Sequence, residues 1–189
     1  MTVKENTKTK IIKASMKLIQ QRGFNGFSFS DVAEIVGIKK ASIFYYFSQK
    51  EELVSAVLSY YSKDFFVRLN TNSSDNNLEN ILNNYCELYA NNLKNDNCIC
   101  LCSMLALESF GLGKQLITLV NDFFKQNIKW ISDQLLNFGF SEKASHSIAQ
   151  HFFIAVQGTQ LIAKNCCNSD YFMQNMKNEI KNIVNKYEN

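Results

Sequence analysis

The chain has 189 residues, no proline, only seven glycines and a net charge of +3. This length supports one sizeable core or two small ones, and the scarcity of helix-breaking residues predicts an all-α protein. No apolar run is long enough to cross a membrane, the N-terminus does not resemble a signal peptide, and the six cysteines are unevenly spaced. We therefore expect a cytoplasmic protein with reduced cysteines.

The charge is unevenly distributed along the chain. Residues 1–50 hold nine basic and three acidic residues, a net +6, so the remaining residues carry −3. Concentrated positive charge favours binding to phosphate groups. The alternative is a solvated, lysine-rich surface.

The first predicted helix runs from about Lys4 to Arg22, because apolar residues recur on one face at helical spacing. Gly23 is the expected C-cap, and Asn25 and Gly26 form the next turn. The residues expected to face the core are Ile11, Ile12, Ser15, Leu18 and Ile19.

The second predicted helix begins after Ser28 and ends at Gly37. Ser28 precedes Asp31 by three residues, which is typical of a capped helix N-terminus. Gly37 ends the helix because glycine adopts a left-handed turn without steric cost.

A third predicted helix spans about Ala41 to Phe47, with Lys39 and Lys40 at its start. Free backbone N–H groups and lysine charge converge there, which favours phosphate. The two short helices around the glycine turn therefore predict a helix-turn-helix that fits the DNA major groove. The residues expected to point into its core are Val32, Val36, Ile43 and Phe47.

Two motifs resemble those of TetR-family transcriptional regulators. Residues 37–58, GIKKASIFYYFSQKEELVSAVL, resemble the family signature around its recognition helix, and residues 22–37, RGFNGFSFSDVAEIVG, resemble the segment before it. The chain departs from the usual pattern at Phe44, where tyrosine is usual, and at Lys39, where serine is common. The matching residues are Arg22, Gly23, Phe24, Val32, Ala33, Gly37, Lys40, Ala41, Ser42, Ile43, Tyr46, Phe47, Lys50, Glu51 and Leu53.

The resemblance implies an all-α fold of about nine helices. It implies a three-helix DNA-binding domain at residues 1–48 and an effector-binding and dimerisation domain at residues 49–189, with a connecting helix at about 49–69. The implied function is a ligand-responsive regulator, most often a repressor. It would bind an inverted-repeat operator as a homodimer, without a cofactor, until a small-molecule effector releases it.

We predict DNA contacts from position on these helices. The exposed front of the third helix would meet the bases, with Lys40 donating to guanine and Ala41 or Phe44 touching thymine methyl groups. Hydroxyl and lysine side chains nearby would hold phosphates. The complete set of predicted DNA-binding residues is Ser30, Lys39, Lys40, Ala41, Ser42, Phe44, Tyr45, Tyr46 and Lys50.

Later helices follow from periodicity and from small polar breaks, the clearest of which is TNSSDNN at residues 71–77. Gly139 is an expected C-cap and Ser141 an expected N-cap. The predicted helices span residues 78–93, 98–110, 114–138, 141–165 and 168–186.

The resemblance implies that the last two predicted helices, at residues 141–165 and 168–186, form the dimer interface. The helix at residues 141–165 carries apolar and small residues over much of its circumference, as suits a helix buried on its own core and on a partner. The alternative is an internal helix of a monomer. The residues predicted for the dimer interface are Phe152, Val156, Thr159, Gln160 and Ala163.

Aromatic residues with a few polar groups, spread over residues 78–165, suit a pocket for an apolar, aromatic or electrophilic effector. The alternative is an ordinary aromatic core. The predicted pocket residues are Tyr85, Tyr89, Cys100, Phe110, Phe123, Trp130, Phe153 and Gln157.

The cluster CICLC places cysteines at 98, 100 and 102. If the segment is helical, these thiols cannot all bind one metal, so no metal site is predicted. They are either structural or sensors of oxidants and electrophiles, which requires an accessible thiolate. CLCSMLALE resembles a C-L-x-x-x-L-A-x-E segment of some TetR-like regulators, which favours Cys100 over Cys102 as the sensor.

We find no glycine-rich phosphate loop, metal-spaced histidine and acidic set, or nucleophile motif. We therefore expect no enzymatic activity. An interaction protein that has lost DNA binding is the remaining alternative.

Overall fold

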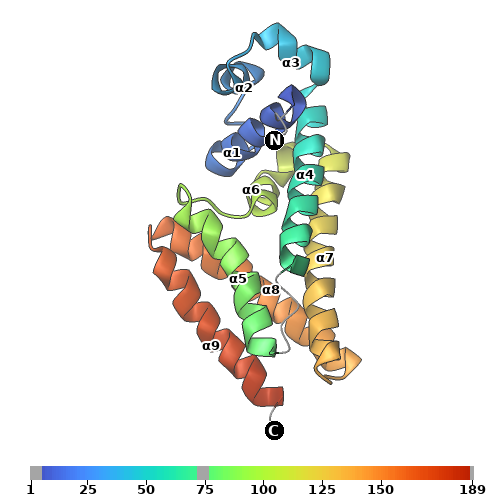
Figure 1. Cartoon of the computed structure of the whole chain (residues 1–189), viewed down its shortest axis with the longest axis vertical. Coiled ribbons are helices and arrows are strands. Elements are labelled where there is room, and N and C mark those ends of the chain that lie inside the picture. The colour runs from blue at the N-terminus through green and yellow to red at the C-terminus, as the bar shows by residue number, and fades with distance from the viewer. Residues whose placement is uncertain (1–5, 72–76, 188–189) are drawn as a thin grey trace, which may run out of the picture. The chain divides into compact units, whose positions relative to one another are not determined.

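The computed structural model describes residues 6–71 and 77–187, and within them every regular element is a helix. This confirms the predicted all-α fold. The predicted start of the first helix at Lys4 and most of the predicted linker at 71–77 lie outside the described residues. The elements are α1 (Thr7–Arg22), α2 (Phe29–Val36), α3 (Lys40–Tyr46), α4 (Lys50–Thr71), α5 (Leu78–Lys94), α6 (Leu101–Leu107), the 3₁₀ turn η1 (Ser109–Gly111), α7 (Lys114–Asn137), α8 (Glu142–Asn165) and α9 (Ser169–Tyr187) (Figure 1).

The chain forms two compact units. The first comprises Met1–Asp64 and Leu101–Asn121, and the second comprises Phe65–Cys100 and Asp122–Asn189. Helices α4 and α7 each contribute residues to both. No helix of the described chain combines the length and hydropathy needed to cross a membrane.

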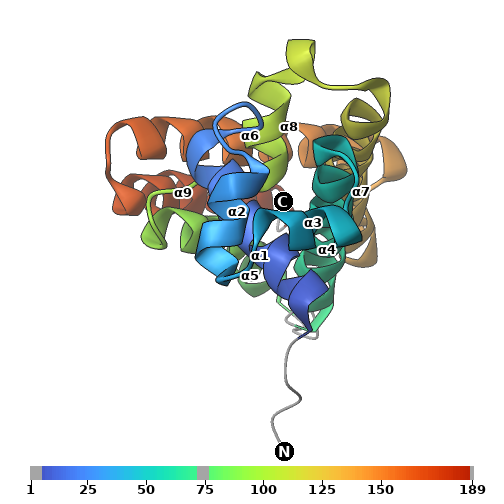
Figure 2. The same ribbon diagram turned by 90° about the horizontal axis from the view of Figure 1, so that it is seen from above.

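In the first unit, α1, α2 and α3 form a small helical head (Figures 1 and 2). The predicted ends of α2 are confirmed. Ser28 and Asp31 form a capping box at its start, and Gly37 at its end is left-handed with φ 73°. Of the residues predicted to face inward, Val36 is only half-buried. The buried ones are Ile11, Ile12, Ser15, Leu18, Ile19, Val32, Ile43 and Phe47.

The second unit is built on α5, which packs against α8 and α9, together with the later part of α7. Each of these helices contributes large side chains to one core. The fully buried aromatic residues there are Phe65, Tyr85, Tyr89, Phe123, Phe152 and Phe172.

The predicted helix at residues 98–110 is wrong at both ends, because α6 covers only Leu101–Leu107. Asp96 and Asn97 have positive φ angles of 65° and 51°, and the Cys100 amide donates to the side chain of Gln160. Residues 98–100 are not helical, and the Gln160 side chain satisfies the Cys100 N–H just before α6 begins.

We expect Gly23→Ala to lower the free energy of unfolding by about 3 kcal/mol, and Gly37→Ala by about 1 kcal/mol. Gly23 has φ 75° and ψ −176°, a conformation almost restricted to glycine, and a methyl group there would displace the carboxylate of Glu108. Gly37 has open space around it. Urea unfolding of both variants checks this, and equal losses would contradict it.

Candidate nucleic-acid interface and effector region

The exposed side of α3 is unusually aromatic. Tyr45 is 84% exposed and Phe44 50% exposed, although burial of such rings is favourable. Phe29 of α2 holds the Phe44 ring edge-on at 5.0 Å between centroids, and Tyr46 holds Tyr45 similarly at 5.1 Å. Each ring therefore contacts one neighbouring ring and leaves much of its surface exposed to another molecule.

The polar residues predicted for DNA lie on the same surface, with one exception. Lys39, Lys40 and Ala41 are exposed at the start of α3, and Ser30 is exposed on α2. Ser42 and Tyr46 are half-buried. The structure thus brings these residues together around α3, where Lys39 occupies the N-cap position without a side-chain hydrogen bond to the helix.

The exception is Lys50, whose ammonium group points back into the head. Its Nζ donates to the carbonyl oxygen of Phe27 and lies 4.7 Å and 4.3 Å from the ring centroids of Phe24 and Phe27. Burial lowers the pKa of Lys50, and the nearby Glu51, Glu108 and Asp31 carboxylates oppose that shift. Lys50 therefore stabilises the turn between α1 and α2 through these contacts. Any contact with phosphate would be additional.

Sequence reasoning missed Glu108, which holds the same turn from the end of α6. Its Oε2 accepts hydrogen bonds from the backbone N–H of Asn25 at 3.0 Å and from the Asn25 side-chain amide at 3.2 Å. The only signal in the sequence was its position as the last residue of the CLCSMLALE motif.

The second unit contains a buried polar cluster that was also missed. Asn127 Oδ1 accepts from the hydroxyls of Tyr85 at 2.9 Å and Tyr89 at 3.0 Å, and Asn127 donates to the Phe123 carbonyl at 2.8 Å. Burial raises the pKa of Tyr85 well above its usual value. All four side chains are buried in an aromatic core, and the two tyrosine hydroxyls share the Asn127 Oδ1 acceptor there.

Most of the aromatic residues predicted for a pocket lie in or beside the buried cluster, whereas one of them, Phe110, is exposed. Trp130 stacks on Tyr85 at 5.6 Å, and Phe153 contacts the edge of the cluster through Phe124. Gln157 is half-buried on α8. Phe110 must be corrected, because its side chain is fully exposed on η1 and lines no buried cluster.

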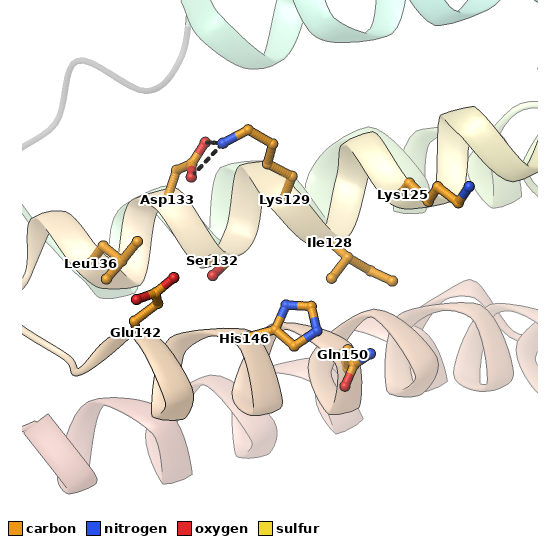
Figure 3. Close-up of a pocket in the computed structure, with 9 residues that line it drawn as sticks. All are labelled: Lys125, Ile128, Lys129, Ser132, Asp133, Leu136, Glu142, His146 and Gln150. Atoms are coloured by element: carbon orange, nitrogen blue, oxygen red, sulfur yellow. Dashed lines mark hydrogen bonds and ion pairs between the residues drawn. The ribbon is translucent and has the colours of Figure 1, made fainter.

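A separate groove of about 460 Å³ lies between α7 and α8 (Figure 3). Its apolar lining residues are Ile128 and Leu136, and Lys129 is paired with Asp133 across one turn of α7 at 2.8 Å. None of the predicted pocket residues lines it. The lining residues are Lys125, Ile128, Lys129, Ser132, Asp133, Leu136, Glu142, His146 and Gln150.

The residues predicted for the dimer interface mostly face the chain's own core. Phe152, Val156, Gln160 and Ala163 are buried, and only Thr159 is half-exposed. The prediction is corrected because the apolar stripe that sequence analysis found on α8 packs within the subunit. A second, shorter stripe is exposed instead, with Ile154 at 65%, Leu161 at 45% and Ile162 at 48%.

The cysteine cluster does not provide the accessible thiolate that sensing requires. Cys98, Cys100 and Cys102 are all buried, and Cys100 is 0% exposed. Burial also raises the pKa of Cys86. Cys166 and Cys167, at the end of α8, are the exposed ones. No group of three metal-binding side chains occurs among the residues that the structure describes.

An N-terminal helix-turn-helix with an exposed, basic second helix, followed by a larger helical unit, defines a class of DNA-binding regulators. The family description "Bacterial regulatory proteins, tetR family" matches residues 11–57. A TetR transcriptional regulator from Legionella pneumophila has the same fold, with a TM-score of 0.90 and 27% sequence identity over 96% of this chain and 98% of that one.

Curated relatives match over part of the chain. The regulator YuxN of Bacillus subtilis is 36% identical over 31% of this chain, and the biofilm operon negative regulator IcaR of Staphylococcus epidermidis is 39% identical over 24%. The matched segments span 20% and 25% of those two proteins. Residues 11–57 therefore form a DNA-binding domain of the tetR type, and the chain as a whole shares the fold of the Legionella regulator.

Proposed function

We propose that the protein is a homodimeric repressor that binds an inverted-repeat operator through α3 and leaves it when a small effector binds. The observation that carries this proposal is the surface of α3, where exposed lysines and exposed aromatic rings lie on a helix-turn-helix. IcaR is a negative transcriptional regulator, which supports repression of transcription over activation.

The roles of the α3 residues follow from groove chemistry. Lys40 would donate to guanine O6 and N7, and Phe44 and Tyr45 would contact base edges and thymine methyl groups. Ser30, Ser42, Tyr46 and Lys39 would bind phosphates and fix the register. The Lys50 ammonium group uses one N–H on the Phe27 carbonyl oxygen, and its other N–H groups would bind a phosphate.

Dimerisation supplies the second half-site, because two recognition helices must lie about 34–36 Å apart. The exposed stripe on α8 suits this role. Ile154, Gly158 and Leu161 follow one another at spacings of four and three, the pattern of a helix–helix seam. Gly158 is exposed with open space at its Cβ position, so nothing in its own subunit requires glycine. A partner helix approaching closely would explain it.

The effector region would comprise the aromatic cluster and the α7–α8 groove. Both use α7 and α8, and the cluster adds α5. Buried tyrosine hydroxyls among aromatic rings suit a planar or apolar ligand with a polar group. The effector would stabilise a state in which the two heads no longer match the grooves, and its influence is limited by its differential affinity for the two states.

Selection of bound duplexes from a random pool, with reduced protein, tests DNA binding. We expect enrichment of an inverted repeat. Tyr45→Ala should change the preferred bases, whereas Lys50→Ala should weaken binding to all sequences. If Lys50 holds a phosphate, the slope of log affinity against log salt should also fall by about 0.9. An unchanged slope would restrict Lys50 to holding the turn, and no enrichment at low salt would favour a protein without DNA binding.

Replacing Leu161 with Glu should convert the dimer to a monomer, because a carboxylate would be buried at the seam without a partner. Leu107→Glu makes the same substitution at an exposed leucine of α6 and should leave the dimer intact. Sedimentation equilibrium at micromolar concentration measures both. A monomeric parent protein would overturn the dimer, and a dimeric Leu161→Glu variant would move the interface away from α8.

Trp130 is the single tryptophan of the chain and lies in the proposed effector region, stacked on Tyr85 and donating to Asn70 Oδ1 at 3.1 Å. An effector binding there should change its fluorescence at the concentration that releases DNA. A compound that releases DNA without changing the emission of Trp130 would place the effector elsewhere.

A further inference from the structure

We propose that Cys166 and Cys167, at the end of α8, form a dithiol site that binds a trivalent arsenical between their two sulfur atoms. The two cysteines are adjacent in sequence, and both are exposed, whereas the other four cysteines of the chain are buried. Sulfur is a soft ligand, so an exposed pair of thiols selects a soft atom that can bond to both of them. The site does not depend on DNA binding.

The backbone around this pair is held by the loop between α5 and α6. Asn97 Nδ2 donates to the carbonyl oxygen of Lys164 at 3.0 Å and to the Cys167 Sγ at 3.6 Å, and Lys164 Nζ donates to the carbonyl oxygen of Asn97 at 3.1 Å. Both Asn97 and Cys167 have positive φ angles, 51° and 49°, which few non-glycine residues adopt. These contacts hold the chain in one conformation at the two cysteines, so a ligand would not have to order the backbone there.

The spacing of the two cysteines favours a bridging atom over a disulfide. Consecutive Cα atoms are about 3.8 Å apart across a trans peptide. Unstrained disulfides join Cα atoms that are about 4.4–6.8 Å apart, so a direct S–S bond between neighbours would distort the chain. An atom bonded to both sulfurs lengthens the bridge by one bond and removes this constraint.

Trivalent arsenic suits this bridge better than a metal ion does. Its three bonds form a pyramid, so two sulfurs bonded to it lie on the same side of the arsenic, as the side chains of neighbouring residues require. A linear two-coordinate ion such as Cu(I) would need the two sulfurs on opposite sides. A structural zinc site needs four ligands, and no group of three metal-binding side chains occurs in the described ranges.

The binding step needs no oxidant or reductant. With an arsenoxide, R–As=O, the two thiols form two As–S bonds while both bonds between arsenic and oxygen break. The oxygen leaves with the two thiol protons as one water molecule. Arsenic remains trivalent and both sulfurs remain at the thiol level of oxidation.

The two cysteines lie away from the dimer seam proposed above. At about 100° per residue, Cys166 lies roughly 110° around α8 from the line through Ile154, Gly158 and Leu161. Cys167 follows the C-cap of the helix. A partner helix seated on that line would therefore leave both thiols in solvent.

Phenylarsine oxide, added to the reduced full-length protein, tests the site by intact-mass and peptide mass spectrometry. We expect one adduct per chain, on the peptide that contains residues 166 and 167. It should survive excess glutathione, a monothiol, and be removed by dithiothreitol, a dithiol. After one As–S bond breaks, the second keeps the arsenic close to the free thiol at high effective concentration. Cys166→Ser and Cys167→Ser should each weaken binding about a hundredfold.

A matched control moves one thiol instead of removing it. Cys166→Ser combined with Lys181→Cys keeps two exposed thiols, because Lys181 is exposed on α9, but it separates them. We expect this double variant to lose its adduct in glutathione, as the single variants do. Three results would each overturn the site: an adduct on Cys98, Cys100 or Cys102, removal of the parent's adduct by glutathione, or an adduct of the double variant that survives glutathione.

Discussion

The turn between α1 and α2 is the constraint on which the geometry of the head depends. A turn with two glycines has little conformational preference of its own, so its shape must come from contacts. Here a lysine on α4 supplies a hydrogen bond and two cation–π contacts, and a glutamate after α6 supplies two hydrogen bonds. Both charged residues are distant in sequence, so the head acquires its final geometry only when later helices are in place.

Local signals predicted much of this fold. The Ser28 capping box, the left-handed Gly37 and the Ser141 cap act within four residues, so the sequence alone indicates where those helices begin or end. The exposed surface of α3 was likewise predictable from helical periodicity and from the family motif. The segment 98–100 was not, because its conformation depends on Gln160, sixty residues away.

The same reasoning explains the errors on α8 and η1. Periodicity shows that α8 has a broad apolar surface, but it does not say which part packs inside the subunit. Burial assigns Phe152 and Val156 to the core and leaves Ile154 outside. Phe110 looked like a core residue by type, yet it lies on a 3₁₀ turn between α6 and α7 and is exposed. Residue type is a weak guide where no regular element fixes the direction of a side chain.

The close approach of Glu108 to Gly23 couples the evolution of two distant positions. While residue 108 is an acid that holds the turn, a side chain at position 23 both strains the backbone and displaces the carboxylate. Loss of the acid removes the second penalty and leaves the first. Side chains at position 23 should therefore occur only in lineages that have lost the acid at position 108, where a replacement meets the backbone strain alone. Lineages that keep the acid should keep the glycine.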